Sequence, residues 1–277
     1  MKSVSSIDNY RSLPHLVKMS RPITSLIASS LTIFVLYFSK SGHLSECIFR
    51  SLPILFLTMI GFILNDIFDI ERDRGRGPEE KPLAYNLISR RLAICYASVL
   101  LIVAFGLEIY YFFLPGLKIV IITFLLLLFY TPFAHRFPLV KGAYTAVLCC
   151  LPLLYGSVLA GRSISLLMYS HLFVFIIGRE LILDAKDFEK DLAFGMRTLI
   201  YYSGKTRCYI IGWSLMWLSI SPGFLTTRTP AGKLLSLVAL AALIICTFFS
   251  QKHQDCAIKL SRGVMFFGAL AIATTAT

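Results

Sequence analysis

The chain has 277 residues, of which 57% are hydrophobic and 15% are charged. Soluble domains hold about 45–50% apolar residues, and apolar runs long enough to cross a bilayer recur along the whole length, so the composition excludes a soluble protein. The net charge of +12 is typical of nucleic-acid-binding proteins, but its distribution over the loops is better explained by membrane topology. We therefore expect an all-α polytopic membrane protein that contacts the lipid bilayer and binds no nucleic acid.

Nine apolar stretches are predicted to span the membrane, after a cytoplasmic lead-in of residues 1–20. Arg21-Pro22 opens the first span, because proline is tolerated in the first turn of a helix, and Thr131-Pro132 is expected to close the fourth. A single domain is expected over residues 1–277. The predicted spans cover residues 23–38, 47–64, 92–113, 119–130, 143–159, 164–183, 208–225, 234–249 and 264–273.

The basic residues gather in alternate loops. If the N-terminus is cytoplasmic, the inside segments hold 20 Lys and Arg and the outside segments hold six, with Arg179 placed near the end of the sixth span. Positively charged loops remain on the cytoplasmic side of a membrane. The N-terminus and the polar ends of the second and sixth spans are therefore predicted to lie on that side.

Two polar stretches at these span ends carry the same pattern. Asn65-Asp66-Ile67-Phe68-Asp69-Ile70-Glu71-Arg72-Asp73 follows the second span, and Asp184-Ala185-Lys186-Asp187-Phe188-Glu189-Lys190-Asp191 ends the sixth. In each, three aspartates stand at i, i+3 and i+7, which on a helix places them within roughly 60° of one face. Carboxylates stacked beside a bilayer repel one another and are costly to keep charged. A cation that offsets this cost is therefore expected at each cluster.

Mg²⁺ suits these clusters, since it takes oxygen ligands and typically combines one or two carboxylates with substrate phosphates and water. Two facing clusters are expected to hold Mg²⁺ around a diphosphate and to stabilise the charge of the leaving group. With an allylic diphosphate, the apolar helices would house the hydrocarbon tail and exclude water from the carbocation. In the alternative interpretation the aspartates are solvated helix ends, paired with Arg72, Lys186 and Lys190.

Both motifs together resemble the two aspartate motifs of the UbiA superfamily of intramembrane prenyltransferases. The resemblance runs from Arg21-Pro22 to Thr198. Shorter similarities accompany the aspartates: Lys81-Pro82-Leu83 after the first motif, Tyr130-Thr131-Pro132 after the fourth span, Arg179-Glu180 before the second motif, and Gly195-Met196-Arg197-Thr198-Leu199 after it.

The resemblance implies nine helices around a central cavity and a Mg²⁺-dependent transfer of a prenyl group from a polyprenyl diphosphate to a small aromatic or lipophilic acceptor. Asp66, Asp69, Asp184 and Asp187 are the expected catalytic residues. The expected metal ligands are Asp66, Asp69, Asp73, Asp184, Asp187 and Asp191. The expected substrate contacts, with Asn65 orienting or ligating, are Asn65, Arg72, Lys81, Lys190, Arg197 and Tyr130.

Several alternatives remain open at this stage. Tyr130 either contacts a substrate or anchors its helix at the membrane interface; His135 is a candidate base or a solvated loop residue; and Glu180 either pairs with Arg179 or lies near the site. A terpene cyclase would use the same ionisation, with the cation captured by the substrate's own double bonds. A phosphoribosyl-transferring relative is a third enzyme class. A transporter is less consistent, since its charges are expected near mid-span rather than at the cytoplasmic ends.

Overall fold

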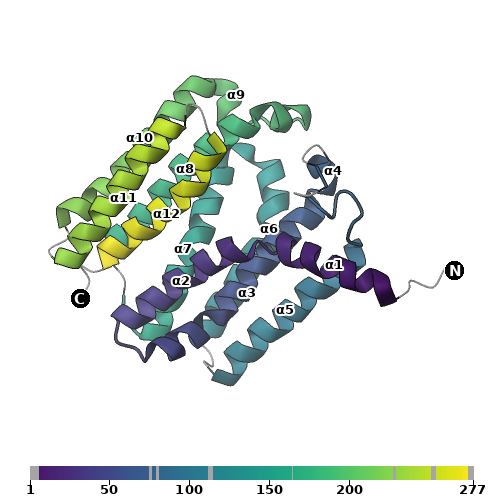
Figure 1. Ribbon diagram of the computed structural model, residues 1–277, viewed down its shortest axis with the longest axis horizontal. Helices are drawn as coiled ribbons and strands as arrows, with labels where there is room; N and C mark the ends of the chain where they lie inside the picture. The colour runs from purple at the N-terminus through teal and green to yellow at the C-terminus, as the bar shows by residue number, and fades with distance from the viewer. Residues whose placement is uncertain are drawn as a thin grey trace. The chain divides into compact units, whose positions relative to one another are not determined.

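A computed structural model describes residues 6–74, 77–78, 81–111, 115–163, 165–226, 229–250 and 254–273, and these ranges are helical almost throughout (Figure 1). No strand occurs in these ranges. The α-helices are α1 (Ser6–Met19), α2 (Pro22–Phe38), α3 (Leu44–Phe68), α4 (Ile70–Asp73), α5 (Arg90–Tyr111), α6 (Pro115–Arg136), α7 (Lys141–Ala160), α8 (Leu166–Ala193), α9 (Leu199–Ser203), α10 (Lys205–Thr226), α11 (Pro230–Phe249) and α12 (Gln254–Ala273).

Helix lengths and composition identify six candidate membrane spans among the described residues. They are α3, α5, α6, the segment Pro138–Ala160 that contains α7, α8 and α11. A seventh arises if Leu13–Met19 and Pro22–Phe38, bent by 47°, are one broken span. The nine predicted stretches fall within helices where they are described, except for Ser165, which precedes α8, but α10 and α12 are not among the candidates. The all-α membrane class is therefore confirmed, and the number of nine spans is not.

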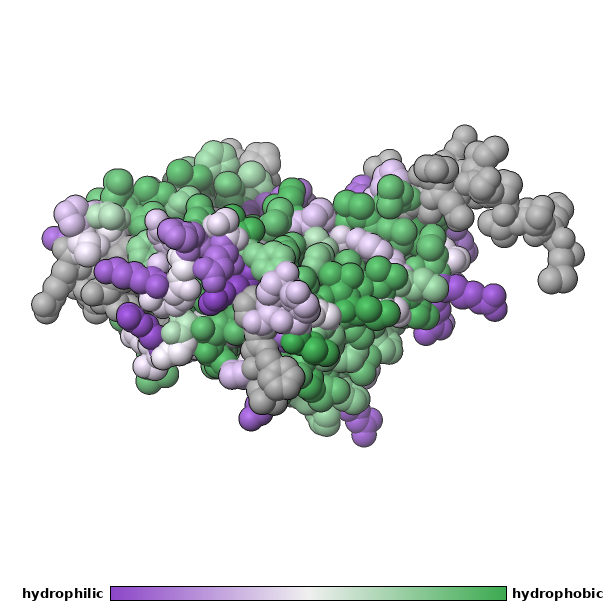
Figure 2. Space-filling model, turned by 90° about the horizontal axis from the view of Figure 1, so that it is seen from below, coloured by the Kyte–Doolittle hydropathy of each residue, from purple (hydrophilic) through white to green (hydrophobic). Residues whose placement is uncertain are grey.

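The surface agrees with a lipid environment. Figure 2 shows apolar side chains over much of the visible face, interrupted by hydrophilic patches. The helices expose large apolar residues such as Ile102, Leu218 and Phe248, which are 71%, 63% and 84% exposed. In water such a surface would promote aggregation, whereas a bilayer solvates it.

The predicted end of the fourth span is wrong. Thr131-Pro132 does not close the helix, because α6 continues to Arg136 with Pro132 inside it. A proline removes one backbone hydrogen bond, but membrane helices tolerate this loss where neighbouring groups satisfy the backbone. The predicted end of the third span includes residues 112 and 113, which lie outside the described residues.

The chain divides into two compact units. Unit 1 comprises Met1–Ser30 and Ile48–Pro132, and unit 2 comprises Leu31–Cys47 and Phe133–Thr277. The first aspartate cluster belongs to unit 1 and the second to unit 2. The expectation of a single domain over residues 1–277 stays a prediction.

Unit 1 is built around α3, whose buried stripe contains Ile54, Leu57, Ile60 and Ile63. Gly61 lets α6 approach closely, because a Cβ at this position would lie 2.7 Å from the Leu127 side chain. The burial of this stripe fixes the orientation of the polar residues that follow it on the same helix.

Unit 2 is built around α8, which packs against α7, α10 and α12 (Figure 1). A Cβ at Gly178 would lie 2.5 Å from the Gly212 carbonyl oxygen, and one at Gly212 would lie 2.7 Å from that of Gly178. The backbones of α8 and α10 are therefore in direct contact, as small residues permit between membrane helices. Nearer the start of α8 the ring of His171 is buried. Its Nδ1 atom lies 2.7 Å from the Ser219 carbonyl oxygen of α10.

Candidate active site

In unit 1 the first cluster stands on an interrupted helix. The helix α3 ends at Phe68, Asp69 has φ −97° and ψ 15°, and α4 begins at Ile70. Two helical hydrogen bonds nevertheless remain across the break, Asp69 N to Asn65 O at 2.9 Å and Asp73 N to Asp69 O at 2.8 Å. All three aspartates are therefore held together as a buried set, only 3–5% exposed.

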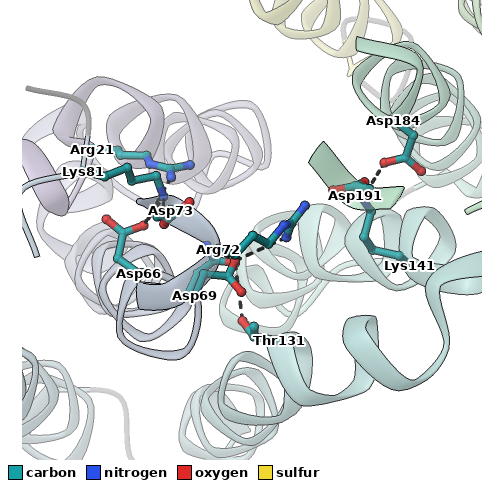
Figure 3. Close-up of polar contacts among 11 residues, drawn as sticks. Arg21, Asp66, Asp69, Arg72, Asp73, Lys81, Thr131, Lys141, Asp184 and Asp191 are labelled. Atoms are coloured by element: carbon teal, nitrogen blue, oxygen red, sulfur yellow. Dashed lines mark hydrogen bonds and ion pairs between the residues drawn. The ribbon is translucent and has the colours of Figure 1, made fainter. Parts of the chain in front are cut away.

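Lys81 neutralises the first and third of these aspartates (Figure 3). Its Nζ lies 2.7 Å from Asp66 Oδ1 and 2.5 Å from Asp73 Oδ2, and the lysine is 5% exposed. Burial of the neighbouring Leu83 and Ala84 holds this part of the loop against the unit. Arg21 adds a second positive charge 3.5 Å from Asp66, with its guanidinium over the ring of Phe62.

The middle aspartate has different partners. Arg72 lies 3.5 Å from Asp69 Oδ2, and Asn65 Nδ2 donates a hydrogen bond to the same oxygen at 3.3 Å. Thr131, from α6, donates to Asn65 Oδ1 at 3.4 Å (Figure 3). This short chain of hydrogen bonds fixes which way the Asn65 amide points. Asn65 and Arg72 thus lie beside Asp69 in the first cluster, and their contact with a substrate stays a prediction.

The loop that carries Lys81 is pinned by one tyrosine. The Tyr85 hydroxyl donates to the Arg74 carbonyl oxygen and accepts the Gly77 N–H at 3.3 Å. Gly77 has φ +86°, a conformation that glycine adopts without steric cost. These bonds join the end of α4 to the segment just after Lys81.

In unit 2 the second cluster stands on the unbroken helix α8. Asp184 and Asp191 are 6% and 0% exposed, whereas Asp187 is half-buried. Lys141, the first residue of α7, makes an ion pair with Asp184 and lies 4.0 Å from Asp191 Oδ2 (Figure 3). One buried lysine therefore contacts the first aspartate and lies near the third in this unit too.

Lys141 was not predicted as a site residue. In the sequence it is one more cation of a cytoplasmic loop, 43 positions before Asp184. Its position directly before the apolar run of α7 was the available signal, because a lysine that begins a buried helix needs a carboxylate partner.

Three of the predicted substrate-contacting residues, Arg197, Lys190 and Tyr130, are exposed or half-buried. Arg197 is exposed, with its guanidinium 5.1 Å from the centre of the Tyr201 ring. Lys190 is exposed near the end of α8, and Tyr130 is a half-buried residue of α6. His135 is exposed. The described contacts thus do not attach Lys190 or Arg197 to the aspartates.

The exposed face of α8 carries charge pairs of its own. Lys205 donates to Glu189 at 2.7 Å, and Lys186 pairs with the exposed Asp255 at the start of α12. The hydrogen bond from Lys186 lowers the pKa of Asp255. These surface pairs tie α8 to its neighbours and are separate from the buried carboxylates.

The donor chemistry of both clusters fits Mg²⁺, because ionised carboxylates and an amide oxygen are the hard ligands that this ion prefers. Among the described residues, however, no three acidic, His or Cys side chains form a ready-made metal cage. The buried lysines explain this in part, since an ammonium group lies against the carboxylates that a metal would bind. The donor set therefore fits the ion in its chemistry, and Lys81 and Lys141 hold the carboxylates that the ion would bind.

Fold and site together define a polytopic membrane protein with two sets of buried carboxylates. The model of the UbiA prenyltransferase family matches residues 26–270. The chain is 28% identical over 248 residues to the digeranylgeranylglyceryl phosphate synthase of Methanoregula boonei, covering 88% of this chain and 87% of the relative. It is 30% identical over 198 residues to that of Natronomonas pharaonis, covering 69% and 70%.

Solved structures share the fold. A UbiA homolog from Archaeoglobus fulgidus bound to GPP and Mg²⁺ has a TM-score of 0.68 at 17% identity, with 95% of this chain and 99% of that chain covered. A structure of digeranylgeranylglyceryl phosphate synthase in membranes has a TM-score of 0.65 at 21% identity, with 96% and 99% covered. The chain belongs to the UbiA prenyltransferase family, and the predicted family and enzyme class are confirmed.

Proposed function

We propose that this protein transfers a prenyl group from a polyprenyl diphosphate to a lipophilic acceptor, with Mg²⁺ bound by Asp66, Asp69, Asp73, Asp184, Asp187 and Asp191. The observation that carries the proposal is the repeated arrangement of buried aspartates with one buried lysine, Lys81 in unit 1 and Lys141 in unit 2. Buried carboxylates are costly unless compensated. Their presence at the ends of two apolar helices is consistent with a site for cations and an anionic substrate.

Each group of side chains has a distinct task in this proposal. Bound Mg²⁺ would supply Lewis acidity that stabilises the diphosphate leaving group. Lys81 and Arg72 in unit 1, and Lys141 in unit 2, are proposed to supply positive charge to diphosphate oxygens, the lysines as point charges and the arginine as a planar fork. Thr131 and Asn65 hold Asp69 in position. The apolar helices surround the prenyl chain and exclude water from the allylic cation.

The remaining predicted contacts are proposed to act outside this centre. Lys190 and Arg197 are exposed cations that attract the anionic substrate to the membrane surface. Tyr130 lies one residue before Thr131 on α6 and contacts the substrate close to Asn65. The site is proposed to open to the cytoplasm, because the basic loops gather on the side where both clusters are predicted.

The names of the relatives suggest the chemical class of the acceptor. Eight relatives that are 26–30% identical to this chain are digeranylgeranylglyceryl phosphate synthases. Their product carries two geranylgeranyl groups on glyceryl phosphate, so the second group must be added to a hydroxyl of a singly prenylated glyceryl phosphate. We propose geranylgeranyl diphosphate as donor and this hydroxyl as acceptor.

The test is a mass-spectrometric assay of the purified protein in nanodiscs, with geranylgeranyl diphosphate and Mg²⁺, with and without geranylgeranylglyceryl phosphate. Diphosphate release and an ether product that depends on the acceptor are expected, both abolished by EDTA. Hydrocarbon or terpene alcohol formed equally without acceptor would favour a terpene cyclase instead. Unchanged activity in EDTA would contradict the metal assignment.

A further inference from the structure

Glu180 is an ionisable residue that the roles assigned above do not use. It lies on α8, is only 8% exposed, and stands within a candidate membrane span. It forms an ion pair with the adjacent Arg179, whose Nη1 lies 3.6 Å from Glu180 Oε1. Ionisable groups inside membrane spans are expensive to keep and commonly mark functional sites.

A purely structural ion pair explains Glu180 poorly. Neighbouring residues of a helix point about 100° apart, and a separation of 3.6 Å is longer than a charge-assisted hydrogen bond. Two apolar side chains of similar volume would stabilise a buried position at least as well as such a pair. The pair therefore calls for a task other than holding α8 in place.

The position of Glu180 suggests that task. Glu180 precedes Asp184 by four residues, so both lie on the same face of α8, separated by about 6 Å along the axis. The apolar body of α8 precedes Glu180, and the aspartates follow it. Glu180 therefore lies one turn closer than Asp184 to the apolar body of α8, where the prenyl chain is proposed to lie.

The neighbouring helix α7 packs closely against Glu180. Gly142 faces Glu180, and a Cβ there would lie 3.3 Å from the Glu180 Cβ. Lys141, one residue earlier on α7, contacts Asp184. The turn of α7 that bears these two residues thus lies against both Glu180 and Asp184, and it holds the glutamate beside the second cluster.

We propose that Glu180 is the general base that takes the proton of the acceptor hydroxyl; this inference rests on the proposed transfer reaction. The hydroxyl oxygen forms a bond to the allylic carbon, and the bond from that carbon to the diphosphate oxygen breaks, with its electron pair leaving on diphosphate. The hydroxyl proton moves to a Glu180 carboxylate oxygen. The Arg179 guanidinium, 3.6 Å from the Glu180 carboxylate, partly compensates its negative charge.

The decisive variant is Glu180→Gln, which keeps the shape of the side chain and removes the base. Glu189→Gln is the matched control on the same helix, since Glu189 is exposed and pairs with Lys205. General bases contribute about 10²–10⁴-fold, so ether formation is expected to fall at least about 100-fold in Glu180→Gln and to stay unchanged in Glu189→Gln. The KM for geranylgeranyl diphosphate is expected to change little.

Two further readouts separate a base from a structural or metal-binding role. Diphosphate release to water is expected to persist in Glu180→Gln, so the ratio of geranylgeraniol to ether product rises. An acceptor analogue with a thiol in place of the hydroxyl loses its proton more readily, so the defect is expected to shrink to less than about tenfold with it.

The outcomes distinguish the two proposals. If the wild type forms no ether, the proposed function itself fails. If the wild type forms ether and Glu180→Gln forms it at the same rate, the base assignment fails while the transfer stands. Equal loss of diphosphate release and ether formation, unrelieved by the thiol acceptor, would also overturn the base assignment.

Discussion

The two units support the same aspartate spacing with different backbones. In unit 1 the helix breaks at Asp69, and the neutralising Lys81 comes from the loop that follows the cluster. In unit 2 the helix α8 is continuous, and Lys141 comes from the preceding helix α7. A shared pattern of residues thus leads to similar charge compensation through different local structures. Unit 1 depends on its loop, whereas unit 2 depends on the packing of two helices.

The largest effect is expected from the first aspartate of each set. Asp66→Asn and Asp184→Asn each remove a carboxylate that the proposal assigns to Mg²⁺, so prenyl transfer is expected to fall about 1,000-fold in either variant. A steady-state assay of ether formation checks this. If only one of the two variants is impaired, the clusters are not equivalent and the parallel between the units fails.

The lysine variants test the difference between the units more finely. Lys81 makes two short contacts, whereas Lys141 makes one and lies 4.0 Å from its second aspartate. Removing one partner of a buried pair costs about 3–5 kcal/mol, so Lys81→Met is expected to lower the melting temperature without Mg²⁺ more than Lys141→Met does. Both are expected to lose about 100-fold in transfer rate, as for other lost electrostatic contacts in active sites.

Added Mg²⁺ should restore much of the lost stability, because an ion that binds only the folded state stabilises it. Thermal unfolding in detergent, with and without the ion, measures this. Lys186→Met serves as the control, since Lys186 pairs with the exposed Asp255. If adding Mg²⁺ does not change the melting temperature of the Lys81→Met variant, this result would argue against a metal at Asp66 and Asp73.

A smaller effect is expected from Thr131→Val, which has no counterpart among the contacts described in unit 2. The substitution keeps the shape of the side chain but removes the hydrogen bond to Asn65. Groups that orient metal ligands typically contribute 10–100-fold, so a loss of about tenfold in the transfer rate or in the apparent Mg²⁺ affinity is expected. Thr58→Val is the control, because among the described residues Thr58 donates within its own helix α3, to the Ile54 carbonyl oxygen at 2.8 Å. Equal rates in both variants would remove Thr131 from the site.

The smallest effect is expected at the surface of unit 2. Asp255→Asn breaks the exposed pair with Lys186, and such pairs contribute about 0–1 kcal/mol, so transfer is expected to remain at the wild-type rate. The hydrogen bond from Lys186 lowers the pKa of Asp255 in the folded protein. The pair therefore stabilises the protein above the unfolded pKa of about 3.9 and loses its effect as the pH falls through the lowered value. Melting curves at pH 7 and at acidic pH check this.

The sequence predicts the helices and the grouping of the aspartates within each cluster, because apolar length and residue spacing are local signals; the role of the aspartates stays a prediction. It predicts less about the partners of these residues. Lys81 lies 15 positions from Asp66, and the short motif Lys81-Pro82-Leu83 indicates it. Lys141 lies 43 positions from Asp184, and its contact with that residue depends on the packing of α7 on α8. Contacts of that kind follow from tertiary structure, which residue spacing does not encode.

The sequence also does not predict where the helices break or continue. The spacing of Asp66, Asp69 and Asp73 indicates one continuous helix, but the chain departs from it at Asp69. Conversely, Pro132 indicates a helix end, but α6 continues past it. In both places the surrounding helices decide the conformation, and local propensity is overridden.

The contact between Gly178 and Gly212 has a consequence for how unit 2 responds to a ligand. Because each backbone fills the space where the other would carry a side chain, neither helix has room to rotate or advance at this crossing. Asp184 lies less than two helical turns after Gly178 on α8. The backbone that carries its carboxylate is therefore held in a fixed position. Little binding energy is then lost to rearranging the scaffold, and adaptation to different prenyl donors must come from side chains. A single Gly178→Ala substitution would force α8 and α10 apart and misplace Asp184 without altering any residue of the polar cluster.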